Sequence, residues 1–186
     1  EGLSLAAMTE TPVVVCLAQR PAPATGLPTK TEAADLLFAI FSGHGEFARV
    51  VFAPGSPEEA FYLTNKAFDM AEKFQIPVII LTDQYLADSH WSYDNLDLEG
   101  IVYNDYRLRG DDFSQLEIYK RHCFTEDGVS PLGVPGSATH LVVTDSDEHD
   151  EEGHITEDGQ IRVKMVEKRS KKKLTSIRSM IQPPIL

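Results

Sequence analysis

The sequence predicts an α/β fold in which a parallel sheet is flanked by helices, followed by an extended connector and a C-terminal helix. Short apolar runs alternate with helical stretches from residue 12 to about residue 89, which is the pattern of an α/β sheet. The run at 78–82 is continuously apolar, as expected of a parallel strand that is covered on both faces. Beyond residue 89 the alternation ends, which predicts a second part with a different architecture.

The first part of the chain divides into strands and helices in order. The Leu and Ala spacing at 3–8 suits the end of an amphipathic helix, and a strand is expected at 13–18. A short helix is predicted at 32–41, with Thr31 as its N-cap. A second strand is predicted at 48–53.

A longer helix follows from strong local start signals. Ser56 is a capping residue, Pro57 suits the first helical position, and two glutamates complement the helix dipole in the first turn. The apolar residues after them recur at helical spacing, so we expect them to pack in the core. The third strand is predicted after this helix, at 78–82.

The second part of the chain is less regular. Residues 90–137 have few periodic runs, and such a long irregular stretch argues against a self-contained domain. We expect an extended connector packed over a neighbouring domain or subunit. A short strand is predicted at 140–144, and a helix rich in Lys and Arg at about 157–180. The predicted organisation is two parts, 1–89 and 90–186, of which the second leads to a further domain.

Composition and charge exclude several classes of protein. The chain has 186 residues, of which 42% are hydrophobic, enough for a packed core. The formal net charge of −12 argues against a nucleic-acid partner. Cys16 and Cys123 have no paired spacing, which favours reduced thiols in a cytoplasmic protein. We expect no membrane partner, because no apolar stretch is long enough to cross a bilayer and no signal peptide is evident. The sequence lacks an initiator methionine, and we expect it to belong to a longer protein.

The most informative stretch is the loop at 19–32, which directly follows the first predicted strand. Three prolines stiffen it, and Gly26 permits a turn that a side chain would block. Arg20 offers a planar fork of donors that matches a carboxylate or phosphate, and Thr25 and Thr29 add hydroxyls. Open α/β sheets bind ligands at the carboxyl ends of their strands. The loop is therefore either an anion site or a proline-rich surface loop with a solvated arginine.

Three other constellations have two interpretations each. The acidic tract at 145–154, which contains two histidines, suits either a metal site or a solvated or interface-pairing loop, and we assign no metal ligand. The basic helix, with Lys168 and Arg169, suits either nucleic-acid or anionic-membrane contact, or a solvated face or subunit contact. His44 lies between two glycines and suits either acid–base chemistry or a structural role.

Several segments taken together resemble one family. They are 8–12, 19–32, 43–47, 53–55, 77–89 and 147–154. In this order the chain resembles the alpha subunit of a 2-oxoacid:acceptor oxidoreductase, the thiamine-diphosphate group that includes 2-oxoglutarate:ferredoxin oxidoreductase. The resemblance implies an incomplete thiamine-diphosphate-binding fold, with part of the pyrimidine-type domain in 1–89. It also implies oxidative decarboxylation of a 2-oxoacid, such as pyruvate or 2-oxoglutarate, to acyl-CoA and CO₂, with electrons passed to ferredoxin.

The resemblance implies cofactors and partners as well. Thiamine diphosphate and Mg²⁺ would be held by, or shared with, the beta subunit, and an iron–sulfur cluster would belong to a partner chain. The 2-oxoacid, coenzyme A and ferredoxin would be the substrates of a hetero-oligomer. The cysteine content agrees, because two cysteines cannot ligate a four-iron cluster by themselves.

The resemblance assigns roles to four residues. Arg20 matches the arginine that binds the 1-carboxylate of the substrate, and Thr25 and Thr29 match threonines that line the same pocket. His44 is a candidate for the pocket wall. All four are substrate-binding assignments, and they rest on the resemblance.

The chain also departs from the family pattern. Ala22 and Ala24 replace the usual glycine and serine of the loop, and Ala33 stands where glutamine is common. The family glutamate that activates the aminopyrimidine lies upstream of this sequence. We therefore expect no catalytic residue in this fragment and no activity from it alone. The alternative function is a non-catalytic α/β module that assembles through its acidic tract and basic helix.

Overall fold

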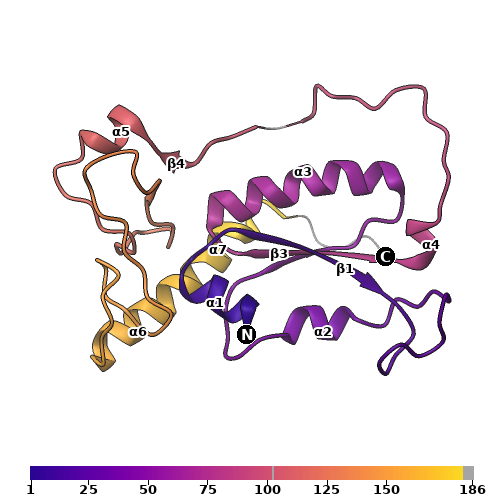
Figure 1. The fold of residues 1–186 in the computed structure, drawn as a ribbon, viewed down its shortest axis with the longest axis horizontal. Helices are drawn as coiled ribbons and strands as arrows, with labels where there is room; N and C mark the ends of the chain where they lie inside the picture. The colour runs from indigo at the N-terminus through magenta and orange to yellow at the C-terminus, as the bar shows by residue number, and fades with distance from the viewer. Residues whose placement is uncertain (102, 182–186) are drawn as a thin grey trace.

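The computed structural model describes residues 1–101 and 103–181 (Figure 1). At its centre is a three-stranded parallel sheet in the order β1-β3-β2. The strands are β1 (Val13–Gln19), β3 (Pro77–Asp83) and β2 (Val50–Phe52). Strand β3 is central and is paired along its whole length with β1. This confirms the predicted parallel sheet.

Helices cover the sheet from both faces. Helix α3 (Pro57–Phe74) lies on one face and α2 (Leu36–Phe41) on the other (Figure 1). Successive residues of β3 serve the two faces in turn, because side chains alternate along a strand. Val78 and Ile80 pack in the core under α3, whereas Ile79 packs in the core on the α2 side.

Helix α3 begins and ends where local sequence signals place it. The Oγ of Ser56 accepts a hydrogen bond from the backbone N–H of Glu59 at 3.1 Å, and a carboxylate oxygen of Glu59 accepts one from the N–H of Gly55 at 2.7 Å. The helix ends at Gln75, whose φ of 53° is left-handed. Its buried residues are Ala67, Met70, Ala71 and Phe74. The predicted start is confirmed. The predicted core face is confirmed for Ala67, Met70 and Ala71, whereas Phe61 and Phe68, which were also expected in the core, are exposed.

The helix predicted at 32–41 begins later than expected. Helix α2 starts only at Leu36, and Thr31 is not its cap. The Oγ1 of Thr31 instead accepts a hydrogen bond from the backbone N–H of Tyr85 at 3.3 Å, and the side chain of Gln19 accepts one from the N–H of Asp35 at 3.0 Å. These two contacts hold the residues before Leu36 in a loop, and the helix therefore begins at Leu36.

The prediction of a strand at 140–144 is wrong. Among residues 1–101 and 103–181 this segment has no strand partner, and Leu141 is 82% exposed. The carbonyl of Val143 lies so close to Gly153 that a side chain at 153 would collide with it. The segment therefore packs closely on the acidic tract, and its short apolar run does not reflect a sheet.

Short elements make up the rest of the fold. They are α1 (Gly2–Met8), α4 (Gln84–Ala87), α5 (Gly110–Ser114), and the two-stranded parallel sheet of β4 (Arg107–Leu108) and β5 (Leu132–Gly133). The connector before β4 runs along α3 (Figure 1). The hydroxyl of Tyr93 accepts a hydrogen bond from the N–H of Glu58, and that of Tyr106 bonds Asp69 in α3. Part of the connector thus packs on this chain's own helix, and the division at residue 89 stays a prediction.

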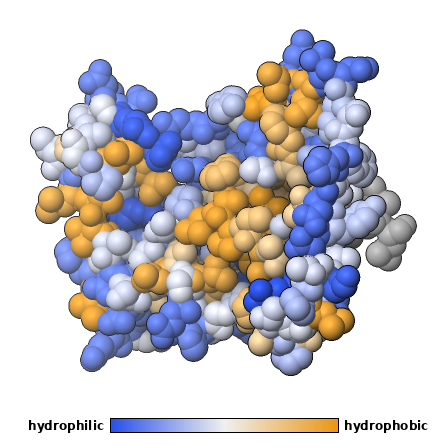
Figure 2. Space-filling view, turned by 45° about the vertical axis from the view of Figure 1, so that its right-hand side comes forward, coloured by the Kyte–Doolittle hydropathy of each residue, from blue (hydrophilic) through white to orange (hydrophobic). Residues whose placement is uncertain are grey.

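The C-terminal helix is confirmed and has a wide turn in its middle. It consists of α6 (Gly159–Glu167), the π-helical turn η1 (Lys168–Lys172) and α7 (Lys173–Arg178). Across residues 1–101 and 103–181, no helix is long and apolar enough to cross a membrane. Apolar side chains do gather on one face of the molecule (Figure 2).

Candidate functional site at the carboxyl edge of the sheet

Two loops meet at the edge where the parallel strands end, which we call the carboxyl edge. The register pairs Gln19 with Asp83, the last residues of β1 and β3. The proline loop therefore begins beside α4, which directly follows β3. Ligands of open α/β sheets bind at this edge. The local topology places the predicted anion loop where such a site is expected.

The backbone of the proline loop is tightly turned. Ala24 and Thr29 have positive φ values of 52° and 61°, and Gly26 has a φ of 54°. A side chain at Gly26 would collide with the carbonyl of Pro21, so the turn requires glycine. The loop thus has a specific shape, which an unstructured surface loop would lack.

The predicted ligand groups of this loop are exposed. Arg20, Thr25 and Thr29 all lie on the surface. Within the described part of the chain, the guanidinium of Arg20 has no hydrogen bond or ion pair. Its five donors are therefore available to an external carboxylate or phosphate.

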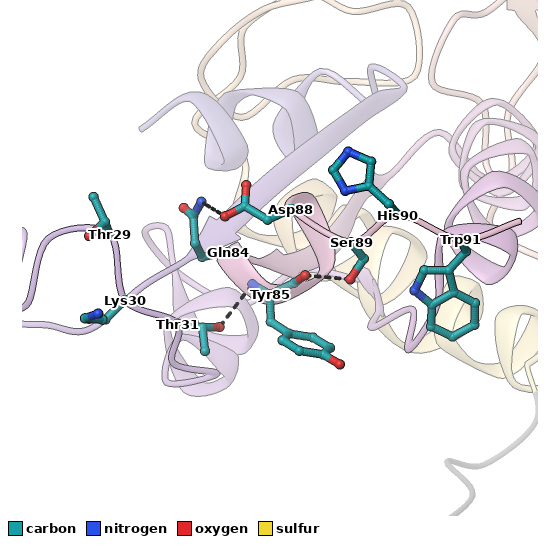
Figure 3. A pocket seen from close by; sticks show the side chains of 9 residues that line it. All are labelled: Thr29, Lys30, Thr31, Gln84, Tyr85, Asp88, Ser89, His90 and Trp91. Atoms are coloured by element: carbon teal, nitrogen blue, oxygen red, sulfur yellow. Dashed lines mark hydrogen bonds between the residues drawn. The ribbon is translucent and has the colours of Figure 1, made fainter.

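Thr29 also lines an open groove between the proline loop and the segment after β3 (Figure 3). The groove has a volume of about 540 Å³. Its lining residues are Thr29, Lys30, Thr31, Gln84, Tyr85, Asp88, Ser89, His90 and Trp91. The sequence analysis assigned no role to the lining residues from Gln84 to Trp91. They follow a buried parallel strand, and that position could have indicated a binding site.

The walls of the groove are held by short polar contacts. Besides the bond from Tyr85 to Thr31, the side-chain amide of Gln84 donates to Asp88 at 2.6 Å. The hydroxyl of Ser89 donates to the carbonyl of Tyr85 at 2.7 Å. The first of these contacts ties the proline loop to α4, and the other two hold residues 84–89 together.

His44 lies at the opposite edge of the sheet from Arg20. Its backbone N–H donates to the Oγ of Ser4 in α1 at 2.6 Å. It lines a small cavity of about 100 Å³ together with Phe47 and Arg169. A seven-residue strand spans roughly 20 Å, so the structure does not bring His44 together with Arg20.

The acidic tract pairs with the C-terminal helix. Both carboxylate oxygens of Glu148 accept hydrogen bonds from Arg169 at 2.8 Å, and one also accepts from Arg162 at 2.6 Å. His149 is fully buried. Among the described residues no group of three or more His, Cys, Asp or Glu side chains is placed to hold a metal ion.

Three cations of the basic helix are buried rather than exposed. Lys168, Arg169 and Lys173 are each less than one-tenth exposed. The prediction of a solvated basic face is therefore wrong for these three residues. Each of them faces a carboxylate inside the chain, and Lys168 and Lys173 share the carboxylate of Glu10.

Comparison with known proteins assigns the chain to a family. Residues 1–168 match the family described as "Pyruvate flavodoxin/ferredoxin oxidoreductase, thiamine diP-bdg". The chain belongs to this family. The match covers the proline loop, the groove and the acidic tract, and it confirms the resemblance that the sequence motifs indicated.

Named relatives agree with the family. Subunit alpha of 2-oxoacid:ferredoxin oxidoreductase 1 from Sulfurisphaera tokodaii is 46% identical over 175 residues, which cover 92% of this chain and 27% of the relative. The 2-oxoglutarate synthase subunit KorA from Archaeoglobus fulgidus is 43% identical over 84 residues, covering 45% of this chain and 24% of that protein. This chain therefore spans about a quarter of the length of these curated relatives.

A solved structure has the same fold. It is 2-oxoglutarate:ferredoxin oxidoreductase from Magnetococcus marinus with 2-oxoglutarate, coenzyme A and succinyl-CoA bound. Its TM-score is 0.87 at 34% identity, over 98% of this chain and 31% of that chain. The thiamine-diphosphate-binding fold expected from the motifs is thereby confirmed.

The exposed donors of the carboxyl edge match an anion, whereas the thiamine ring requires an acceptor. An aminopyrimidine needs a carboxylate as a hydrogen-bond partner. Asp83 already accepts a hydrogen bond from the N–H of Leu86, and Asp88 accepts one from Gln84. Arg20 and the loop hydroxyls match an anion instead. We therefore assign no thiamine-holding residue in this segment and derive no chemical step through the cofactor.

Proposed function

We propose that the chain is the substrate-carboxylate-binding part of the alpha subunit of a thiamine-diphosphate-dependent 2-oxoacid:ferredoxin oxidoreductase. The whole enzyme would convert a 2-oxoacid and coenzyme A to acyl-CoA and CO₂ and pass two electrons to ferredoxin. The observation that supports this most is the unpaired guanidinium of Arg20 on a tightly turned loop at the carboxyl edge. A planar fork there can bind a carboxylate through two parallel hydrogen bonds.

The remaining parts of the site would come from other chains. We propose that the beta subunit holds the diphosphate and Mg²⁺, and that an iron–sulfur cluster lies in a partner chain. The two cysteines support this division, since Cys16 and Cys123 are separate free thiols. A four-iron cluster requires four ligands. The enzyme would be a hetero-oligomer that works in the cytoplasm.

Thr25 and Thr29 belong to the same proposal. Both hydroxyls lie on the loop that carries Arg20, and each can donate to a substrate oxygen. His44 is not kept as a wall of this pocket, because it bonds α1 at the other edge of the sheet.

Replacement of Arg20 tests the proposal in the complete enzyme. We expect Arg20→Ala to raise KM for the 2-oxoacid about 10- to 100-fold, the effect of losing a charge-assisted bidentate hydrogen bond. Arg20→Lys keeps the charge but not the fork, so its KM should lie between those of wild type and alanine. Electron transfer from the reduced cluster to ferredoxin should not change. An unaltered KM in both variants would exclude the assignment.

The alternative of a non-catalytic assembly module has lost its main support. It rested on assembly with other chains through the acidic tract and the basic helix. Glu148 and Arg169 instead pair with each other within the chain. A complete complex that contained no thiamine site would still favour this alternative.

A further inference from the structure

A single buried carboxylate lies at the edge where the strands begin, which we call the amino edge. Glu10 precedes β1, has a left-handed φ of 51° and is completely buried. Its Oε2 accepts hydrogen bonds from Lys168 Nζ at 2.5 Å and from His122 Nδ1 at 2.7 Å. Its Oε1 lies 2.7 Å from Lys173 Nζ. Together with Arg121, these residues form what we call the Glu10 cluster.

The π-helical turn explains how two lysines reach one carboxylate. Lys168 and Lys173 are five residues apart, and in an α-helix of 3.6 residues per turn they would point roughly 140° apart. The turn η1 begins at Lys168 and leads directly into Lys173. Its i→i+5 hydrogen bonding widens the helix so that residues five apart lie near the same side. The wide turn therefore aims both ammonium groups at Glu10.

Arg121 ties the cluster to the starts of two strands. Its guanidinium donates to the carbonyl of Glu10 at 2.7 Å and to the side-chain oxygen of Gln75 at 2.8 Å. Gln75 precedes β3, and its carbonyl lies 3.4 Å from the ammonium of Lys173. The turn before β1, the turn before β3 and the C-terminal helix are thus joined through buried polar groups.

His122 extends the cluster to the acidic tract. Its Nδ1 donates to Glu10, because an ionised carboxylate only accepts, and its Nε2 then accepts from the hydroxyl of Thr144 at 3.0 Å. Its ring lies 4.0 Å from that of the buried His149, measured between centroids. Burial lowers the pKa of His122 to about 4, which agrees with this neutral tautomer.

The cluster holds more positive than negative charge. Burial opposes ionisation of Glu10, but Lys173 and Lys168 outweigh it and hold the pKa of this carboxyl well below its usual range. Opposite this one carboxylate stand the ammonium groups of Lys168 and Lys173 and the guanidinium of Arg121. Burial also lowers the pKa of Lys168 to about 8. Two positive charges more than the single carboxylate of Glu10 can neutralise are therefore buried here.

We propose that the buried carboxylate of Glu10 holds the acidic tract and the C-terminal helix on the sheet through its contacts with buried cations, and we call this arrangement the lock. We further propose that Lys168 is not required for the lock. Without the carboxylate, three cations would face one another away from water, which is strongly unfavourable. Without Lys168, the carboxylate keeps Lys173 and His122 as partners. The proposal does not depend on the proposed function, because it concerns contacts within this chain.

Hydrogen exchange in the complete enzyme tests the lock. Glu10→Gln should speed amide exchange in 140–178 on the order of a hundredfold, because it leaves buried charges uncompensated. Exchange in β3 should change little, because its apolar contacts with α3 and α2 remain. Lys168→Met should leave the protection of 140–178 unchanged or increase it.

Matched variants separate charge from position on the helix. Glu167→Gln and Lys171→Met alter exposed residues of the same helix and should leave exchange unchanged. The double variant Glu10→Gln, Lys168→Met should exchange more slowly than Glu10→Gln alone, because it contains one buried cation fewer. If Glu10→Gln alone assembles poorly into the complete enzyme, the two variants can still be compared. The readout is then whether the added Lys168→Met change restores assembly.

Three results would overturn the proposal. The first is unchanged exchange of 140–178 in Glu10→Gln, which would make the carboxylate dispensable. The second is equal loss of protection in β3, which would show that Glu10 stabilises the whole fold rather than these segments. The third is a loss in Lys168→Met as large as in Glu10→Gln, which would show that the lock needs both lysines.

Discussion

At the scale of single residues, Gly26 decides whether the proline loop can present its donors. We expect Gly26→Ala in the complete enzyme to raise KM for the 2-oxoacid. Its φ of 54° and the nearby Pro21 carbonyl leave no room for a side chain. A left-handed non-glycine residue costs about 1–3 kcal/mol, so the loop is expected to relax into another conformation. Steady-state kinetics would measure the change.

The control for this variant is Gly100→Ala. A side chain at Gly100 would meet no atom within 4 Å, so its kinetics should match those of wild type. If Gly26→Ala left KM unchanged, the shape of the loop would not matter for substrate binding. Binding of the substrate by Arg20 would then not depend on the conformation of the loop.

The position and burial of some residues can be predicted from the sequence, and those of others cannot. Arg20 was noticed from its position after a strand and from the prolines around it, which are local signals, and its substrate-binding role was assigned from the family resemblance and stays a prediction. Glu10 was not predicted as a buried charge, although it stands in a recognised motif. Its partners lie more than 100 residues away, so no local pattern reports its burial.

At the scale of elements, the C-terminal helix should become harder to open as the pH rises from about 8 to 9. Burial lowers the pKa of Lys168 from 10.5 to about 8. Above pH 8 the open helix binds a proton that the folded helix has released, so raising the pH favours the folded state. Hydrogen exchange of residues 159–178, corrected for its intrinsic pH dependence, measures this free energy of opening.

The neighbours of Lys168 define that pH window. The charged and titratable groups that face it are Glu10, Arg121, His122, Cys123 and Lys173. Burial lowers the pKa of Lys173, which acts in the same direction. Burial raises the pKa of Cys123 from 9, so its effect opposes the trend above that value. If the free energy of opening changed with pH in Lys168→Met as it does in wild type, Lys168 would not be the source of the pH dependence. In the control variant Lys171→Met the pH dependence should be that of wild type.

Elements are predictable where their signals are local. Helix α3 was placed correctly because Ser56 and Pro57 are side by side in the sequence and act on adjacent backbone groups. The start of α2 was missed because it depends on Gln19 and Tyr85, which are distant in sequence. The π-helical turn was also missed, since it follows from the position of Glu10.

At the scale of the whole molecule, the two edges of the sheet have different chemistry. The carboxyl edge presents unpaired donors, among them Arg20, on exposed loops. The amino edge buries its charges and pairs them, with Glu10 at the centre. The parallel sheet could be anticipated from the run at 78–82, whereas the order of the strands and this asymmetry required the fold. Buried charges that contact one another can hold segments of the chain together, whereas exposed donors can bind a ligand.

The isolated chain 1–186 should bind a 2-oxoacid weakly and should not oxidise it. Asp83 and Asp88 each accept a hydrogen bond within α4 and its cap, and the resemblance places the glutamate that activates the thiamine ring outside this segment. Ferredoxin or viologen reduction, assayed with thiamine diphosphate, Mg²⁺ and coenzyme A, measures turnover. The complete enzyme, assayed against pyruvate, 2-oxoglutarate and branched-chain 2-oxoacids, is the positive control. Turnover by the chain alone would show that this segment contains its own activating group, and the proposed division of the active site among chains would have to be abandoned.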